Sequence, residues 1–412
     1  MAAFTRVEDA QISPDGALVA LVAGQYFTSG TSKPTSQIWL APADGSAPAR
    51  PVSGGPRTDT TPRWSPDGTQ IAFLSDRLQD GKPQVFLLGR GGGDPRQLTS
   101  LPGAIEELEW SPDGTQLAFL MRDPEPEATQ ARVARGDDAI EVELFHRWRR
   151  VWTMDVASGA ARQMTGDAQV WEFCWLPDGG FALLVGDEPY EWAWFTAKLA
   201  RVGPGGGTPE TIYSVPEKQF AFPRVSPDGC WLVFLECILS DRGINGGDVL
   251  LLDLRDPNQP PRNLTSGYCG SVWALQWRPD NTQIDFLAFE EGEAALGLID
   301  VAAGTRITRW RAAVGLHEHY GGQFRARDAD VFAVLRDDAT HPADAWVGRV
   351  AGDALEWRRV TDFHPQLAGD ALGETRRLSW HAADGWPITG QLVLPVGYEE
   401  GQPAPLIVWV HG

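Results

Sequence analysis

The segment from residue 122 to residue 150 concentrates charged side chains that could bind the ends of a peptide. A guanidinium can hold a terminal carboxylate through two hydrogen bonds, and a carboxylate can hold a free amino terminus. The candidate residues are Arg132, Arg135, Asp137, Asp138, Glu141, Glu143, Arg147, Arg149 and Arg150. Glu188 and Glu191 lie in a second, shorter segment of the same character. Such charges are also common on solvated surfaces, so both interpretations stay open.

His317, Glu318 and His319 place two imidazoles two residues apart. On a strand, residues i and i+2 share a face, so both rings could reach one metal ion. The sequence shows no third ligand to go with them, and we favour a loop without a metal. We therefore expect no metal and no cofactor.

Serine-based nucleophilic catalysis in α/β-hydrolases uses a Gly-x-Ser-x-Gly turn, which exposes the serine between a strand and a helix. No segment of the 412 residues matches this pattern, and residues 30–34 and 267–271 fail it. A serine also needs a histidine base and an orienting acid. We expect no catalytic residue within these 412 residues and no activity from the chain alone.

A repeated turn sets the organisation of the chain. Trp-Ser-Pro-Asp-Gly at residues 64–68 recurs with variations, so that the motif Asp falls at 15, 67, 113, 178, 228, 280 and 328. A repeat near 50 residues is typical of a β-propeller, with one blade per copy. Ser, Pro, Asp and Gly each suit a position of a hairpin turn. We interpret the Trp as a wedge between blades and the motif as structural rather than catalytic.

Short apolar or alternating runs flank each motif copy and read as strands. The run that follows the motif is found in all seven repeats, a third strand can be assigned in five and a fourth in four. Four strands in each of seven repeats predict an all-β fold, a seven-bladed β-propeller.

The interval of 65 residues between Asp113 and Asp178 is the longest and contains the charged segment described first. That segment lies between the second and third strands of blade 3. In a four-stranded blade, second-to-third loops share a face with the chain's entry and exit. We therefore expect the insertion to project toward whatever is attached at the propeller's ends.

Composition narrows the class of function. The formal net charge is −20, which argues against nucleic-acid binding. The four cysteines show no C-x-x-C spacing, which fits a reducing compartment. No signal peptide and no membrane span can be recognised. We expect a cytoplasmic protein that contacts neither membrane nor nucleic acid.

The pattern changes after residue 361. Residues 374–380 and 388–394 alternate like a hairpin around Asp384 and Gly385. Residues 406–410 then form a continuous apolar run, which is typical of a strand buried on both faces of an α/β sheet. We assign residues 1–368 to the propeller and residues 369–412 to the truncated start of an α/β-hydrolase domain.

The seven blades, the Trp-His-x-x-Asp-Gly-x-x-Ile-x-Gly hairpin at 380–390 and the Pro-Leu-Ile-Val-x-Val-His-Gly run at 405–412 together point to one family. The chain resembles the prolyl oligopeptidase family of serine peptidases, in particular its acylaminoacyl-peptidase-like branch. The resemblance covers the whole chain, and the tail motifs are more specific than the blade motif.

The resemblance implies an α/β-hydrolase domain after the propeller, with a Ser, Asp and His triad beyond residue 412. His411 and Gly412 match the start of a segment whose backbone helps to form the oxyanion hole. The propeller would cap the active site and admit short or N-acylated peptides. The implied partners are peptide substrates, the hydrolase domain and further copies of the full-length chain in a homo-oligomer.

Two alternatives remain. A free-standing propeller that binds protein or peptide partners, like the Tol-type translocation propeller, would need the tail to be dispensable and normally carries a signal peptide. A metal-dependent propeller hydrolase would need acidic or histidine ligands converging on the central tunnel, and no such set is evident.

Overall fold

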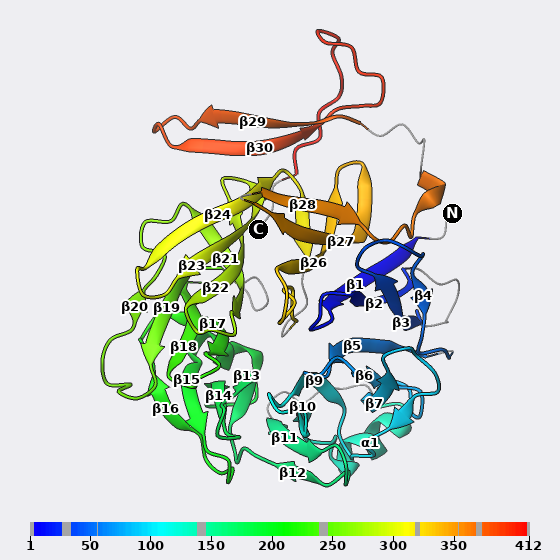
Figure 1. Cartoon of the computed structure of the whole chain (residues 1–412), viewed down its shortest axis with the longest axis vertical. Coiled ribbons are helices and arrows are strands. Elements are labelled where there is room, and N and C mark those ends of the chain that lie inside the picture. The colour runs from blue at the N-terminus through cyan, green and yellow to red at the C-terminus, as the bar shows by residue number, and fades with distance from the viewer. Residues whose placement is uncertain are drawn as a thin grey trace.

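The computed structural model describes residues 4–26, 34–55, 57–137, 146–238, 246–317, 322–352, 354–367 and 373–409. These residues form seven four-stranded antiparallel sheets and one two-stranded hairpin. The sheets follow one another in chain order around a ring, one blade each (Figure 1). The predicted all-β, seven-bladed propeller is therefore confirmed.

The strand bounds follow the chain order. Blade 1 consists of β1 (Thr5–Ile12), β2 (Leu18–Gln25), β3 (Ser36–Pro42) and β4 (Arg50–Pro51). Blade 2 consists of β5 (Asp59–Trp64), β6 (Gln70–Ser75), β7 (Gln84–Gly89) and β8 (Arg96–Gln97). Blade 3 consists of β9 (Ile105–Trp110), β10 (Gln116–Arg122), β11 (Arg149–Asp155) and β12 (Ala161–Gln163). Blade 4 consists of β13 (Gln169–Trp175), β14 (Phe181–Gly186), β15 (Lys198–Val202) and β16 (Glu210–Tyr213).

The later blades have the same plan. Blade 5 consists of β17 (Gln219–Val225), β18 (Trp231–Cys237), β19 (Asp248–Asp253) and β20 (Arg262–Asn263). Blade 6 consists of β21 (Gly270–Trp277), β22 (Gln283–Glu290), β23 (Glu293–Asp300) and β24 (Thr305–Ala312). Blade 7 consists of β25 (Gly315–His317), β26 (Val331–Asp338), β27 (His341–Ala351) and β28 (Ala354–Arg359). The remaining elements are α1 (Glu127–Ala134), the 3-10 helices η1 (Glu191–Thr196) and η2 (Pro365–Leu367), and the hairpin strands β29 (Thr375–His381) and β30 (Pro387–Val393).

Each motif turn is held by its own side chains, as the second copy illustrates. The Ser65 hydroxyl donates to Asp67 Oδ1 at 2.5 Å and accepts the Gln70 N–H at 3.0 Å. Asp67 Oδ1 also accepts the Thr69 N–H at 3.0 Å. Gly68 has a φ of +68°, which a residue with a Cβ rarely adopts. The Ser65 hydrogen bond holds the pKa of the Asp67 carboxyl below its usual value.

The motif tryptophan is the wedge between neighbouring blades. Trp64 is buried in a cluster that joins Ile38 and Leu40 of blade 1 to Ile71 and Phe73 of blade 2. Its indole N–H also donates to the Gln11 carbonyl of the preceding blade at 3.1 Å. The equivalent bonds run from Trp110 to the Arg63 carbonyl (2.9 Å), from Trp175 to the Glu109 carbonyl (3.5 Å) and from Trp277 to the Arg224 carbonyl (2.9 Å). One side chain thus buries apolar area and satisfies a backbone acceptor.

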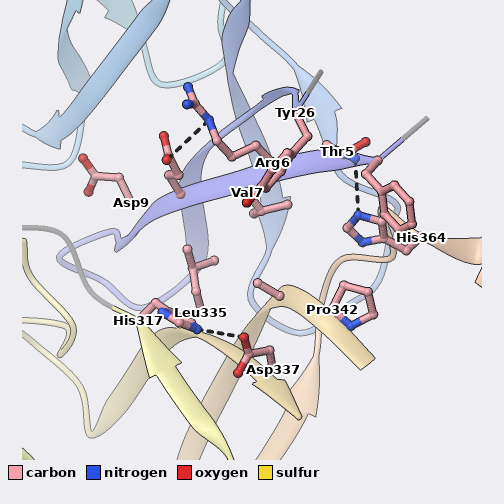
Figure 2. A pocket seen from close by; sticks show the side chains of 13 residues that line it. Thr5, Arg6, Val7, Asp9, Tyr26, His317, Leu335, Asp337, Pro342 and His364 are labelled. Carbon is pink, nitrogen blue, oxygen red and sulfur yellow. Dashed lines mark hydrogen bonds and ion pairs between the residues drawn. The ribbon is translucent and has the colours of Figure 1, made fainter. Parts of the chain in front are cut away.

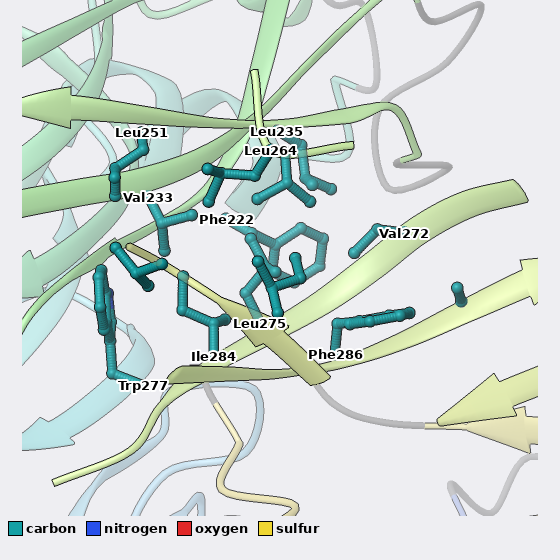
Figure 3. Packing of buried hydrophobic residues seen from close by; sticks show 14 of the residues in the cluster. Phe222, Val233, Leu235, Leu251, Leu264, Val272, Leu275, Trp277, Ile284 and Phe286 are labelled. Atoms are coloured by element: carbon teal, nitrogen blue, oxygen red, sulfur yellow. The ribbon is translucent and has the colours of Figure 1, made fainter. Parts of the chain in front are cut away.

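The hydrophobic core lies between blades rather than within one of them. Figure 3 shows the cluster between blades 5 and 6, where Phe222, Val233 and Leu251 of one blade face Trp277 and Phe286 of the next. The side chains of the second and third strands are largely buried, which explains the unbroken apolar runs in the sequence.

The ring closes without exchange of a strand between blade 1 and blade 7. Each of these blades is built from one continuous stretch of chain. Gln323 donates its N–H to Gln11 Oε1 at 2.7 Å, and Asp328 donates its N–H to the Pro14 carbonyl at 2.9 Å. A shared apolar cluster completes the closure, with Ile12 on one side and Leu335 on the other.

The C-terminal part follows a different plan. The predicted hairpin is present as β29 and β30, which pair from Thr375–Val393 to His381–Pro387. The strand predicted over residues 406–410 is not formed: Leu406, Ile407, Val408 and Trp409 are 71 to 89% exposed and lie in no strand. No strand of the described residues pairs with this segment, so its backbone lacks the ladder that a strand requires. Val410 lies outside the described residues.

Candidate functional site

The second-to-third-strand loops and the ends of the propeller share one face, which we call the loop face. The Tyr26 N–H, at the end of β2, donates to the Phe4 carbonyl beside the start of β1 at 3.1 Å. The insertion between β10 and β11 and the η1 segment between β14 and β15 occupy the same place in their blades. The turns that carry the Ser-Pro-Asp-Gly motif lie on the opposite face, which we call the motif face.

The first and last blades line an open cavity of about 710 Å³ at the loop face, which we call the seam cavity (Figure 2). Blade 1 contributes residues 4–9 and Tyr26, and blade 7 contributes His317, Leu335 and Asp337. Pro342, Ala343 and His364 complete its wall. The cavity therefore lies where blades 1 and 7 meet without a shared strand.

An imidazole–carboxylate pair lies in the wall of the seam cavity. His317 Nε2 is 2.9 Å from Asp337 Oδ2, and this hydrogen bond raises the pKa of His317 above its usual value (Figure 2). His364 Nε2 accepts the Thr5 N–H at 3.3 Å. The described wall contains no serine or cysteine. The cavity can therefore bind a ligand or hold a proton, but its described wall offers no seryl or thiol nucleophile.

His317 was the first residue of the possible metal site. Glu318 and His319 lie outside the described residues. Among the described residues, no group of three or more His, Cys, Asp or Glu side chains could hold a metal ion.

The charged insertion contains a short helix, α1, that the sequence did not predict. Arg132 pairs with Asp137 at 3.0 Å, and Arg135 is exposed just after the helix. Arg147 donates to the Asp123 carbonyl at 3.1 Å and forms an ion pair with Glu125. The candidate residues Asp138, Glu141 and Glu143 lie outside the described residues.

Arg149 and Arg150 are buried at the base of the insertion. Arg149 pairs with Glu106 at 2.6 Å and donates to the Trp171 carbonyl at 3.0 Å. Arg150 pairs with Asp123 and with Asp167, each at 3.0 Å. These contacts join the insertion to blades 3 and 4. A role in substrate contact stays a prediction for every residue of the candidate set.

An aromatic cluster that the sequence did not reveal joins the insertion to the loop of blade 4. The rings of His146 and Tyr190 are 5.6 Å apart, those of His146 and Trp148 are 5.8 Å apart, and Tyr190 stacks on Trp192 at 6.3 Å. Trp192 is 53% exposed. We call these four residues the aromatic patch. No local sequence pattern marks it, because most of the 18 tryptophans, these two included, fall outside the repeated motif.

Glu188 and Glu191 flank Tyr190 in the sequence. Glu188 is half-buried and Glu191, the first residue of η1, is exposed. The structure therefore places both carboxylates in the loop that carries part of the aromatic patch. The neighbouring Asp187 pairs with Lys198 at 2.7 Å.

The family model of the TolB beta propeller domain matches residues 5–142. An uncharacterized peptidase, YuxL of Bacillus subtilis, is 37% identical over 107 residues, which cover 26% of this chain and 16% of YuxL. Dipeptidyl-peptidase 5 of Porphyromonas gingivalis is 22% identical over 99% of this chain and 62% of its own length. The solved Pyrococcus horikoshii acylaminoacyl peptidase has a TM-score of 0.69 at 17% identity, over 98% of this chain and 59% of its own. The resemblance to the prolyl oligopeptidase family is confirmed.

At this level of identity, the likeness to the solved structure establishes the fold. The chain spans less than two thirds of the length of each of these proteins. His411 and Gly412, at the expected oxyanion-hole segment, lie outside the described residues. No helix of the described residues is long and apolar enough to cross a membrane.

Proposed function

We propose that this chain is the substrate-gating propeller of a serine peptidase that hydrolyses short or N-acylated peptides. In this proposal residues 369–412 begin an α/β-hydrolase domain that supplies the Ser, Asp and His. The observation that carries the proposal is the exposed run Leu406–Trp409, which follows a hairpin that belongs to no blade. Four consecutive apolar side chains at 71 to 89% exposure are typical of a surface that packs against a further structure.

Two further observations support the proposal. The longer relatives include proteins named peptidases, and this chain matches about three fifths of two of them. The loop face also carries the features that suit a gate: the seam cavity, the charged insertion and the aromatic patch. In the proposed assembly this face lies toward the hydrolase domain. His411 and Gly412 would then begin the oxyanion-hole segment.

The deciding experiment compares the 412-residue chain with the product of the full reading frame. Peptide p-nitroanilides of two to four residues, with free and with acetylated amino termini, are suitable substrates. We expect hydrolysis by the full product and none by the 412-residue chain, because the nucleophile lies outside it. Hydrolysis by the shorter chain would contradict the proposal, as would the absence of Gly-x-Ser-x-Gly from the next hundred or so residues of the reading frame.

Gating has its own test in the full product. We expect short peptides to be cleaved much faster than the same sequence within an unfolded protein of several hundred residues. Substitution of the exposed Arg135 by Gln should change kcat/KM between substrates with free and with amidated carboxyl termini. Arg201→Gln is the matched control, because Arg201 is half-exposed and pairs with Asp178 on a motif turn. Equal cleavage of long and short substrates would contradict a gate.

The match of residues 5–142 to the TolB propeller model favours one alternative, a propeller that binds a protein or peptide partner. That function requires no hydrolase domain. A full product without peptidase activity that forms a stable complex with a partner would support it.

A further inference from the structure

Seven side chains, one from each blade, meet in a second cavity on the axis of the ring. Each is the residue immediately before the first residue of the motif. Six of them are the penultimate residue of a first strand, and Gln323 lies between β25 and β26. They are Gln11, Arg63, Glu109, Cys174, Arg224, Gln276 and Gln323, and all seven line a cavity of about 400 Å³. We call it the axial cavity. Its volume lies within the range of small-molecule sites.

An irregularity in the first strand helps to place these side chains. The pairing of β1, β5, β13, β17 and β21 with the following strand shifts register shortly before the wedge. Asp9, Thr61 and Phe222 have positive φ at these bulges. A bulge re-aims the following side chain, and repetition around the ring gathers those side chains on the axis.

Prolines and tryptophans make up much of the rim of the axial cavity, which Arg325 and Arg327 also line. Six motif prolines and four wedge tryptophans surround it. The prolines are Pro14, Pro66, Pro112, Pro177, Pro227 and Pro279, and the tryptophans are Trp64, Trp110, Trp175 and Trp277. Because the prolines belong to the motif turns, the axial cavity opens at the motif face, away from the seam cavity and the aromatic patch.

Several polar groups of the floor are engaged within the ring. Arg63 pairs with Asp9 at 2.9 Å. Gln276 donates to the Arg325 carbonyl at 2.9 Å and accepts the Arg325 N–H at 3.0 Å. Gln11 bonds to Asp9 and accepts the Gln323 N–H. These side chains hold neighbouring blades together.

Glu109 and Arg224 differ from this group. Both are half-buried, and within the described part of the chain neither forms an ion pair with a neighbour. Arg224 makes one hydrogen bond, to the Pro223 carbonyl at 2.9 Å. Burial raises the pKa of Glu109 to about 7, although the charges of Arg224 and Arg63 favour its ionised form. The Cys174 side chain of the intervening blade is the third member of this part of the floor.

We propose that the axial cavity binds a small zwitterion, a free amino acid or a dipeptide, through its α-carboxylate on Arg224 and its α-ammonium on Glu109. A guanidinium with free donors prefers a carboxylate, and an enclosed carboxylate prefers an ammonium. Arg63 is paired with Asp9, Arg325 is paired with Asp285 and Asp330, and Arg327 is exposed. Within the cavity this leaves Arg224 for a carboxylate and Glu109 for an ammonium, so a ligand with both charges fits best. The prolines and tryptophans of the rim offer contacts to a short side chain. This site is separate from the proposed gate and does not depend on it.

The test titrates the 412-residue chain with four probes in a calorimeter at about pH 7.5: alanine, Ala-Ala, N-acetyl-Ala-Ala and Ala-Ala amide. We expect a free probe to bind and each blocked dipeptide to bind at least about tenfold more weakly than Ala-Ala, because each blocked end loses a charged hydrogen bond. The affinities for alanine and for Ala-Ala show whether the ligand is a free amino acid or a dipeptide. Failure of both to bind at millimolar concentration, or equal binding of free and blocked dipeptides, would overturn the proposal.

Two variants assign the ends of the ligand. Glu109→Gln should remove the preference for Ala-Ala over its acetylated form and keep the preference over its amide. Arg224→Gln should do the reverse. A folding defect would weaken all probes alike, so the crossed selectivity tests the site itself. Arg201→Gln, which lies outside the axial cavity, is the control and should leave both preferences unchanged. If both cavity variants keep both preferences, the assignment of the two ligand ends is wrong.

Discussion

The blades bury their apolar side chains, whereas the C-terminal segment leaves several of its own exposed. In the ring, each blade covers the apolar face of its neighbour, and a wedge such as Trp64 is only 6% exposed. In residues 373–409, Trp386 is 72% exposed and Trp409 is 89% exposed. The ring is therefore complete in itself, whereas the C-terminal segment has apolar side chains that its own structure does not bury.

The largest expected effect is on the free energy of unfolding, and it distinguishes a tryptophan of the ring from one of the C-terminal hairpin. Trp64→Ala should lower the free energy of unfolding by about 3–5 kcal/mol, because it leaves a cavity between two blades and frees the Gln11 carbonyl. Trp386→Ala, in the exposed hairpin, should change it by less than about 0.5 kcal/mol. Urea unfolding followed by circular dichroism measures both. Equal losses would show that the hairpin is as much a part of the core as the wedge is.

An intermediate effect concerns association. The exposed Leu406–Trp409 run should make the 412-residue chain self-associate. The double variant Ile407→Asp, Trp409→Asp should weaken that association at least tenfold, because burial of each apolar side chain contributes about 1.5–3 kcal/mol. The free energy of unfolding should stay nearly constant. Sedimentation velocity over a range of concentrations measures this. A chain that is monomeric before substitution would contradict the reading of this segment as an interface.

The smallest effect concerns pH. The Ser65 hydrogen bond lowers the pKa of Asp67 below its ordinary value near 3.8 in the folded chain. The ionised Asp67 therefore stabilises the folded chain fully at a pH above the ordinary pKa of the unfolded chain. This stabilisation is lost as the pH falls through the lowered pKa of the folded chain. Asp67 is exposed to solvent, so Asp67→Asn should cost less than about 1 kcal/mol at pH 6 and should flatten the decline in stability near pH 3. Asp384→Asn, at the same position of the hairpin turn, is the control outside the ring. A steeper decline in the Asp67 variant would contradict this linkage.

The parts of the fold that depend on interactions between residues close in the sequence could be predicted well. The motif turns are stabilised by bonds between residues two to five positions apart, so their chemistry is visible in the sequence. The third strands of blades 4 and 6 were missed. β15 has five residues, and the first five residues of β23 include two Ala and one Gly, so β propensity does not reveal either strand. Their neighbours in the sheet decide their structure.

The candidate site was harder to predict because it depends on contacts between loops. The long interval in the motif spacing identified the insertion, but not the helix α1 or the pairing of Arg149 with Glu106. The aromatic patch joins His146 to Tyr190 across two blades, which no local pattern records. The axial cavity was visible in principle, because its residues occupy one fixed position relative to the motif. Their convergence required the ring.

Because the ring closes without a shared strand, each blade corresponds to one uninterrupted length of gene. A recombination point between two blades would therefore transfer or duplicate a whole blade together with its wedge and its axial residue. Such an exchange would alter one position of the axial ring at a time and leave the rest of the architecture intact. A composition as mixed as Gln, Arg, Glu and Cys around one axis is accessible to evolution by this modular route.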